Sequence, residues 1–265
     1  MMENLTIIIP VHEFNKTIEP LLTKAIKSVT DQCIGLDSIL IVGPSKVISK
    51  LDKLGTKILI NNDSTDYCTQ INLAVKNCNT KYFSILGFDD TYSKTWFKNV
   101  KTYIENMPEY SIFAPIVKFI DKDENDLGMI NEIIWAMSFS NEIGVIDEEI
   151  LQSYYDFSVN GAVFRTDDFI EVGMLKPSIK LAFWYEFLMR SVNQNVKIYV
   201  IPKKGYNQLV EREGSLSSEI NKSMDVEERA WWIKLATKEY YFKQERKKSY
   251  TYVPEKKLEE IEGLN

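Results

Sequence analysis

Short apolar runs alternate with amphipathic stretches along the first ninety residues. Val, Ile and Leu dominate the runs, which predicts strands, and the stretches between them carry apolar residues at helical spacing, which predicts helices. The predicted strands are residues 5–11, 38–43, 57–62 and 81–88. The predicted helices are residues 17–32, 47–54 and 67–78. Strands that are apolar on both faces need cover on both, so the pattern indicates an α/β fold with a mostly parallel sheet flanked by helices.

The second half of the chain has a different pattern of apolar and polar residues. A longer apolar run at 110–121 predicts a strand, and a polar turn then leads to a helix-like stretch at 131–139. Residues 158–175 read as a strand followed by a helix. An amphipathic helix is predicted at 181–194, a final strand at 196–202, and a helix with a tail over the last fifty residues. No internal repeat or linker-like tract separates the two halves, so we expect one compact unit.

Composition narrows the classes of function. The chain has 265 residues, 45% hydrophobic and 26% charged, with a formal net charge of -6. A negative net charge supplies no global field for nucleic acid or anionic membranes, so small substrates are favoured. The tail mixes aromatic residues with Lys243, Arg246, Lys247 and Lys248, which leaves a local nucleic-acid contact open.

Cysteine and histidine content argues against several kinds of site. Cys33, Cys68 and Cys78 lack paired CxxC spacing, so neither a disulfide framework nor a zinc site is indicated. His12 is the single histidine, which leaves almost no material for a Ser-His-Asp triad. The acidic start and the lack of a long apolar run predict a soluble cytoplasmic protein without a membrane span.

Two adjacent acids follow the fourth predicted strand, in the stretch "SILGFDDTYSKTWF". In open parallel sheets, ligands bind beyond the carboxyl ends of the strands, which is where Asp89 and Asp90 lie. Neighbouring carboxylates repel each other unless water or a divalent cation screens them. The pair therefore has two interpretations: a metal site, or a cap for the segment that follows.

Other acids have a structural interpretation. Asp63 and Asp66 precede the predicted helix at 67–78, and we expect them to cap it. Asp167 and Asp168 form a second acid pair just before another amphipathic stretch. Helix capping and favourable interaction with the helix dipole account for that pair.

The chain resembles the family 2 glycosyltransferases of the GT-A fold over roughly residues 4–217. The resemblance is carried by "LTIIIPVHEF", "QINLAVKNCNTKYFSILGFDD", "NGAVFRTDDFIEVGML" and "FWYEFLMR", in that order. It implies a GT-A fold whose donor-binding half is residues 1–105 and whose acceptor-binding half is residues 106–217. Residues 218–265 would form a helical extension and tail.

The resemblance also implies roles for individual residues. The loop from Pro10 to Glu13 would hold the nucleotide base, with His12 stacked on it and Glu13 as a hydrogen-bond acceptor. Asp89, helped by Asp90, would bind Mn²⁺ or Mg²⁺ bridging the diphosphate. Hard oxygen ligands suit these ions, and the cation would stabilise the charge of the leaving group.

Departures from the family pattern are equally specific. Gly43 and Pro44 stand where the second strand usually ends in an Asp, and Gly87 replaces the first acid of the metal motif. The usual Glu-Asp pair of the acceptor helix falls on Phe183 and Trp184. Glu186, which lies further along that helix, is then the predicted catalytic base.

Arg212, in "EREGSLS", replaces a histidine that often reaches the metal in this family. An arginine can contact the diphosphate with its planar fork and so partly substitute for a cation.

The resulting hypothesis is a metal-dependent, inverting glycosyltransferase that uses a nucleotide-diphosphate sugar, with a UDP-sugar as the preferred donor. A glycan, a lipid-linked sugar or nucleic acid would be the acceptor, and homo-oligomerisation is left open. Two alternatives remain: a transferase acting on a hydroxymethylated base in DNA, and a noncatalytic protein that binds nucleotide sugars. Salt-sensitive DNA binding would favour the first, and binding without turnover would favour the second.

Overall fold

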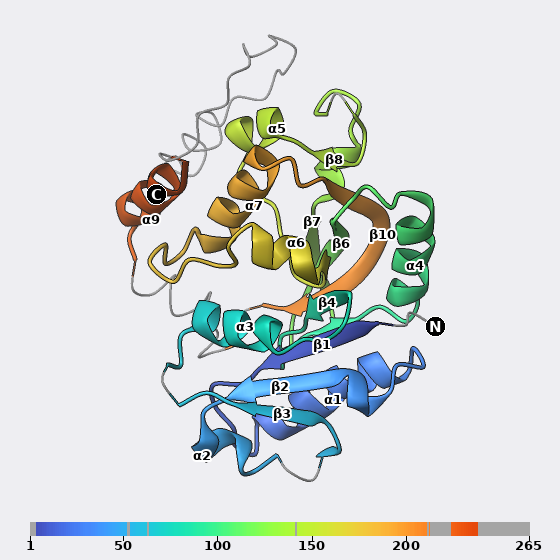
Figure 1. Ribbon diagram of the computed structural model, residues 1–265, viewed down its shortest axis with the longest axis vertical. Helices are drawn as coiled ribbons and strands as arrows, with labels where there is room; N and C mark the ends of the chain where they lie inside the picture. Colours follow the sequence, from blue (N-terminus) through green and yellow to red (C-terminus); the bar gives the residue numbers. More distant parts are fainter. Residues whose placement is uncertain are drawn as a thin grey trace.

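The computed structural model describes residues 4–51, 54–62, 64–140, 142–210, 212 and 224–237. Ten strands of these ranges form one mixed sheet (Figure 1). The strands are β1 (Leu5–Pro10), β2 (Ile39–Gly43), β3 (Lys57–Ile60), β4 (Tyr82–Ile85), β5 (Thr91–Tyr92), β6 (Ile112–Ile120), β7 (Asp126–Ile130), β8 (Val145–Ile146), β9 (Val163–Arg165) and β10 (Ile198–Leu209).

Helices flank the sheet. They are α1 (Ile18–Thr30), α2 (Ser45–Ile48), α3 (Tyr67–Lys76), α4 (Trp96–Asn106), α5 (Glu148–Ser153), α6 (Thr166–Glu171), α7 (Phe183–Asn193) and α9 (Val226–Thr237). Two 3-10 turns, Leu36–Ser38 and Glu132–Trp135, also lie within the described ranges. The alternation predicted for the first half is confirmed. The predicted helix at 131–139 is wrong, because only the short turn at Glu132–Trp135 forms there.

Strand directions bring several loops to one edge of the sheet. The order is β3-β2-β1-β4-β9-β6-β10-β5, with β7 paired to β6 and β8 to β10. β1 to β4 are mutually parallel, and β4 and β6 each run antiparallel to β9. β6 is therefore parallel to β4, and β10 is parallel to β6. The carboxyl ends of β1, β4 and β10 consequently lie on the same side.

The two faces of β1 explain its continuous apolar sequence. Ile8 points to a core shared with α3, α6 and α7, whereas Ile7 and Ile9 point to a core shared with α1 and α4. All three isoleucines are fully buried. Each side chain of the strand is apolar because helices cover the sheet on both sides, as the alternation of buried runs predicted.

β10 is the strand that departs most from the sequence prediction. Its pairing with β6 shifts register between Val200 and Lys204 and again between Lys204 and Tyr206. Irregularities of this kind bend a strand, and Figure 1 shows β10 as a long curved ribbon. The strand continues to Leu209 instead of ending at residue 202. Its second part passes the loop that holds the Asp89–Asp90 pair.

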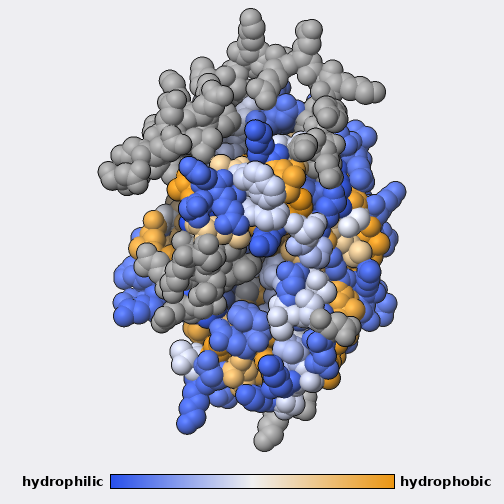
Figure 2. All heavy atoms as spheres, turned by 90° about the vertical axis from the view of Figure 1, so that its left-hand side faces the viewer, coloured by the Kyte–Doolittle hydropathy of each residue, from blue (hydrophilic) through white to orange (hydrophobic). Residues whose placement is uncertain are grey.

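The described part of the extension is α9, which packs beside α7. Ala236 joins the core that α7 also lines, and the Lys180 ammonium lies 5.8 Å from the ring centroid of Trp232. Figure 2 shows hydrophilic residues over this side of the molecule, with smaller hydrophobic patches among them. Within the described ranges, no helix combines the length and apolar character needed to cross a membrane.

Candidate functional site

Three loops meet at the carboxyl edge of the sheet. The loop after β1 carries His12 and Glu13, and the loop after β4 carries Asp89. Arg212 follows the end of β10 by three residues. These residues come from distant parts of the sequence, and the common direction of the three strands brings them together. The structure therefore joins all the predicted donor-side residues in one region.

Arg212 is the centre of this charged cluster. Its Nε donates to Asp89 Oδ2 at 2.5 Å, and its Nη1 lies 3.3 Å from Glu13 Oε1. The guanidinium also lies over the ring of Phe88, 4.8 Å from the centroid. Two carboxylates and an aromatic face thus orient a mostly buried arginine. Guanidinium groups in such settings bind phosphate oxygens well because their donors form a planar fork.

His12 lies at the rim of the same cluster. Its Nε2 is 3.5 Å from Glu13 Oε1, and its ring centroid is 5.5 Å from that of Phe88. The His12 side chain is 45% exposed, so a flat ligand can reach its ring. Pro10 ends β1 and pairs with Val42 of β2. Stacking of His12 on a base therefore stays a prediction with a geometry that permits it.

Asp90 is held inside the protein. Its Oδ2 accepts from the Tyr206 hydroxyl at 2.7 Å, and its Oδ1 accepts from the Leu209 backbone N–H at 2.8 Å. Only 8% of Asp90 is exposed. Burial raises its pKa to about 7, the negative charge of Asp89 adds to the rise, and the two hydrogen bonds oppose it. Asp90 fastens the loop after β4 to β10.

Gly87 is part of the same arrangement. Its backbone N–H donates to the Tyr206 hydroxyl oxygen at 2.9 Å. A Cβ at position 87 would lie 2.5 Å from Asp90 Oδ2, which is closer than atoms can approach. The position of Asp90 thus excludes a carboxylate at residue 87 unless the loop moves.

The side chains of the loop after β4 do not form a conventional binding site for a divalent cation. Both oxygens of Asp90 serve internal hydrogen bonds, Gly87 has no side chain, and Asp89 Oδ2 is bonded to Arg212. Among the residues that the structure describes, no group of three or more His, Cys, Asp or Glu side chains is arranged so that it could hold a metal ion. Mn²⁺ and Mg²⁺ favour several oxygen ligands, whereas this cluster has a cation of its own at its centre.

A cavity of ≈ 290 Å³ opens beside the cluster. Asp89, Arg212, Thr91 and Leu209 line it on the sheet side. Residues of α1 and of the turn after β6, among them Lys24 and Lys122, line the rest. The cluster is therefore reached from a hollow large enough for a small polar group.

Glu186 occupies a different environment from the one a base requires. Its oxygens accept from Arg190 Nε and Nη2 at 2.9 and 2.8 Å, and Lys176 Nζ lies 2.9 Å from Oε1. Only 1% of Glu186 is exposed. A general base must reach the proton that it removes. The predicted role as catalytic base stays untested, and this geometry favours a structural ion pair instead.

The two positions that carry acids in the resembling family are aromatic here and belong to the core. Phe183 is buried, and Trp184 stacks on Phe164 with the centroids 5.7 Å apart and an interplanar angle of 16°. α7 thus presents packed rings where a carboxylate would be expected.

Comparison with known proteins decides the family. The model of glycosyl transferase family 2 matches residues 6–172, which is more than half of the chain. The chain belongs to glycosyl transferase family 2. No curated protein gives a significant match.

Solved structures of similar fold come from several glycosyltransferases. Staphylococcus aureus TarS (residues 1–349, in complex with UDP-GlcNAc) has a TM-score of 0.66 at 16% identity, covering 92% of this chain and 68% of TarS. GalNAc-T7 with UDP, GalNAc and Mn²⁺ has a TM-score of 0.57 at 11% identity, covering 80% and 44%. The mannosyltransferase PcManGT of Pyrobaculum calidifontis, with GDP-Man and Mn²⁺, has a TM-score of 0.57 at 11% identity, covering 83% and 60%. At these identities, the likeness shows a GT-A fold.

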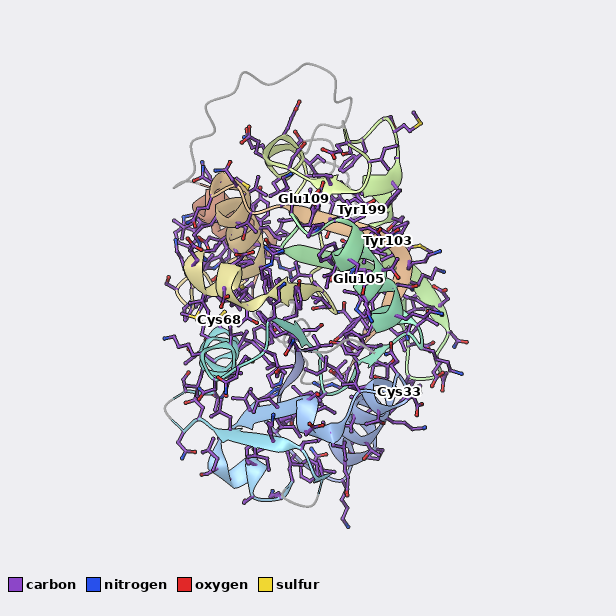
Figure 3. The ribbon with its side chains drawn as sticks, turned by 45° about the vertical axis from the view of Figure 1, so that its right-hand side comes forward. Cys33, Cys68, Tyr103, Glu105, Glu109 and Tyr199 are labelled. Atoms are coloured by element: carbon purple, nitrogen blue, oxygen red, sulfur yellow. The ribbon has the colours of Figure 1, made fainter. Side chains whose placement is uncertain are left out.

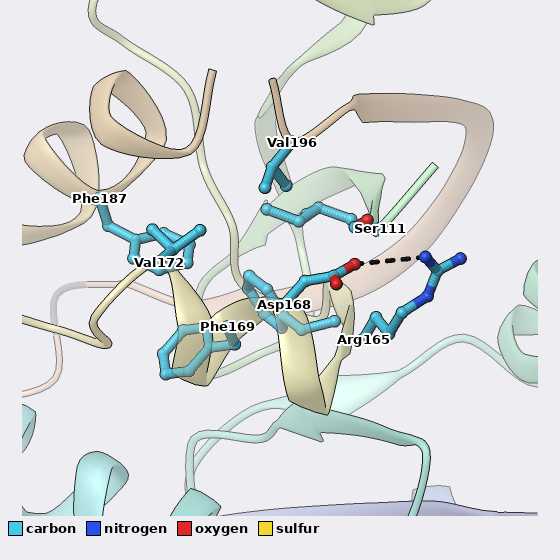
Figure 4. Close-up of a pocket in the computed structure, with 9 residues that line it drawn as sticks. Ser111, Arg165, Asp168, Phe169, Val172, Phe187 and Val196 are labelled. Carbon is cyan, nitrogen blue, oxygen red and sulfur yellow. Dashed lines mark hydrogen bonds and ion pairs between the residues drawn. The ribbon is translucent and has the colours of Figure 1, made fainter. Parts of the chain in front are cut away.

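The remaining acids of this family 2 chain have structural roles. Asp66 caps α3, because its side chain accepts from the Thr69 N–H at 2.8 Å, as predicted. The predicted helix capping by Asp167 and Asp168 is wrong, because both lie within the first turn of α6 and neither makes a cap hydrogen bond; their charges remain favourably placed for the helix dipole. Asp168 pairs instead with Arg165 at 3.3 Å beside a tightly packed apolar pocket (Figure 4). Asp63 lies outside the described residues.

The three cysteines carry free thiols. Figure 3 labels Cys68 on α3 and Cys33 just beyond α1, in separate parts of the molecule. Cys68 and Cys78 have raised pKa values, chiefly because burial disfavours the thiolate. These thiols are therefore poor candidates for chemistry.

Sequence reasoning missed Tyr206, which links Gly87 to Asp90. The polar residues Lys203 and Lys204 and Gly205 interrupt the apolar pattern just before it. They hid the continuation of β10. The structure shows Gly205 and Tyr206 buried and residues 207–209 half-buried, a pattern without the strict alternation that predicts a strand.

Proposed function

We propose that this member of glycosyl transferase family 2 transfers a glycosyl group from a nucleotide-diphosphate sugar to an acceptor hydroxyl, with inversion at the sugar carbon. The observation that carries the proposal is the cluster of Asp89, Arg212 and Glu13 at the carboxyl edge of the sheet. A UDP-sugar is the preferred donor, because TarS, which has a similar fold, was solved in complex with UDP-GlcNAc.

The chemistry is a single displacement. The bond between the sugar carbon and the oxygen of the outer phosphate breaks, and its electron pair stays on the diphosphate. The acceptor oxygen forms the new bond from the opposite face and loses its proton to water or a basic group. Charge develops on the diphosphate, so a fixed cationic donor beside it lowers the barrier. The loop with His12 lies next to that donor and would hold the nucleoside.

The proposal is tested first by binding. A ligand that binds only the folded state raises its melting temperature. We expect UDP, or GDP if the base preference differs, to raise the melting temperature of the full chain. Asp89→Asn should reduce this shift, whereas Asp31→Asn, on an exposed ion pair of α1, should not. If neither nucleotide nor any nucleotide sugar shifts the transition, the proposed function is wrong.

A noncatalytic nucleotide-sugar-binding protein is the second candidate. The aromatic residues Phe183 and Trp184 favour it, because they leave α7 without the usual acids. Turnover separates the two functions: an enzyme releases the nucleotide from its sugar donor when an acceptor or water attacks, and a binder releases the donor intact. Nucleotide release measured by chromatography therefore decides between them.

The DNA-modifying alternative depends on the basic tail around Lys243 and Arg246. Those residues lie outside the described ones, so no structural observation favours this function over the first two.

A further inference from the structure

We infer that the guanidinium of Arg212, in place of a divalent cation, neutralises the diphosphate of the donor in this chain. The inference rests on the proposed function, because it names the group that meets the donor's diphosphate. It concerns Asp89 as well, whose part is to hold Arg212 in position. Binding of the nucleotide diphosphate then proceeds without added metal.

The first argument is the place of Arg212. It lies at the carboxyl edge of the sheet, in contact with Asp89 from the loop after β4 and Glu13 from the loop after β1. A divalent cation held by Asp89 would lie close to the guanidinium that Asp89 already binds. A second positive charge close to the guanidinium would be repelled. Arg212 and a divalent ion therefore compete for Asp89.

The second argument is the loss of other metal ligands. Both oxygens of Asp90 accept hydrogen bonds, from Tyr206 and from the Leu209 backbone, and a side chain at position 87 would collide with Asp90. Asp89 is then the one carboxylate of this loop with an oxygen outside these bonds. Mg²⁺ is usually held by one or two carboxylates together with waters and substrate phosphates, and the one carboxylate left in this loop is already bonded to Arg212.

The third argument is the orientation of the guanidinium. Nε is held by Asp89 at 2.5 Å, and the ring of Phe88 lies against the guanidinium plane at 4.8 Å. The contact from Nη1 to Glu13 is longer, at 3.3 Å, and the Glu13 side chain is 39% exposed. A phosphate oxygen can replace Glu13 at Nη1 while Asp89 keeps its bond. Arg212 then offers a charge-assisted hydrogen bond to the leaving group.

Calorimetric titration of the full chain with UDP and GDP tests this inference without any variant. For the nucleotide that binds more tightly, we expect dissociation constants in EDTA and in Mn²⁺ to agree within about twofold, since Arg212 already supplies the charge. Binding that appears only with Mn²⁺ and disappears in Asp89→Asn would overturn the inference and leave the proposed function intact. Absence of binding under both conditions would overturn both.

Variants at Arg212 sharpen the test. Removing a charged hydrogen-bond partner should weaken nucleotide binding of Arg212→Ala in EDTA roughly 10- to 100-fold. Arg212→Lys should retain part of the affinity, because it keeps the charge and loses the fork. Lys101→Ala, which removes an exposed positive charge on α4, is the matched control and should bind as the wild type does.

Metal rescue gives the most specific outcome. In Arg212→Ala, Asp89 is released from its partner, so Mn²⁺ should restore nucleotide affinity at least about tenfold, an effect absent from the wild type. Arg212→Ala that binds like the wild type in EDTA would contradict the inference. Far-ultraviolet circular dichroism checks the folding of each variant. If Arg212→Ala is unfolded, the inference is tested by Arg212→Lys and by the comparison of wild-type binding in EDTA and in Mn²⁺.

Discussion

Two pairs of acid and arginine in this protein have the same chemistry and opposite surroundings. Glu186 and Arg190 lie one turn apart on α7, and the other donors of Arg190 go to the carbonyls of Val172 and Met174. Asp89 and Arg212 are 123 positions apart and meet at the sheet edge beside a cavity. The first pair is enclosed by protein groups, whereas the second lies beside a cavity and partly exposed side chains.

The difference teaches how to assign a role to a charged pair. A buried pair whose donors and acceptors are all satisfied fixes the local structure, and its members cannot leave their partners for a substrate. A pair with exposed neighbours such as Glu13 and His12 can exchange one contact for another at small cost. Accessibility, more than residue type, separates the structural pair from the candidate functional one.

The largest expected effect comes from breaking the closed pair. Glu186→Ala leaves the charge of Arg190 buried without its partner, so we expect the free energy of unfolding to fall by about 3–5 kcal/mol. Urea denaturation measures it. The matched control is Asp31→Ala, which breaks the exposed pair with Lys27 at the same spacing and should cost below about 0.5 kcal/mol. Equal losses in the two variants would contradict the distinction drawn between the pairs.

The second effect is a pH dependence at the edge of the open pair. The pKa of Asp90 is raised from 3.8 to about 7, so the folded state holds its proton where the unfolded state has lost it. The contribution of Asp90 to stability is therefore fully present below its unfolded pKa of 3.8 and is lost as pH rises towards 7, by at most about 1.4 kcal/mol per pH unit. The groups that interact with Asp90 are Asp89, Tyr206, Arg212, Tyr67 and Tyr92.

Asp90→Asn should remove this slope, because the amide does not titrate. Urea denaturation at pH 5, 6 and 7 measures it as a difference between wild type and variant. Asp121→Asn is the control. The pKa of Asp121 is lowered by its hydrogen bonds to Asn125, so Asp121 titrates below pH 5 and should not change the slope between pH 5 and 7. Parallel stability profiles of wild type and Asp90→Asn between pH 5 and 7 would rule out the raised pKa.

The third effect is expected from the hydroxyl of Tyr206, which links the loop after β4 to β10. Tyr206→Phe removes the donor to Asp90 and the acceptor of the Gly87 N–H, both inside the protein. Leaving buried polar groups without partners costs about 1–3 kcal/mol. Thermal denaturation measures the loss, with Tyr103→Phe on α4 as a more exposed control. A loss no larger than in the control would show that the link does not hold the loop.

The alternation of strands and helices was predictable, because the sheet is covered on both faces and its strands are apolar throughout. The cap at Asp66 was predictable for an equally local reason. The resemblance to the family placed both Asp89 and Arg212 near the diphosphate, but their direct contact was not predicted, since the direction of the far end of β10 leaves no trace in local sequence. Glu186 illustrates the opposite case: Arg190 stands four residues later, and that spacing already indicates an ion pair on a helix.

The crowding between residues 87 and 90 also bears on how this loop can change. An acidic side chain cannot be introduced at Gly87 while Asp90 keeps its place, and Asp90 cannot be released while Tyr206 holds it. A third carboxylate in the loop, at position 87, is therefore expected to need a second substitution, either at Asp90 itself or at Tyr206, which lies more than a hundred residues away. Single-site libraries of this protein would miss such variants, and paired libraries at positions 87, 90 and 206 would reach them.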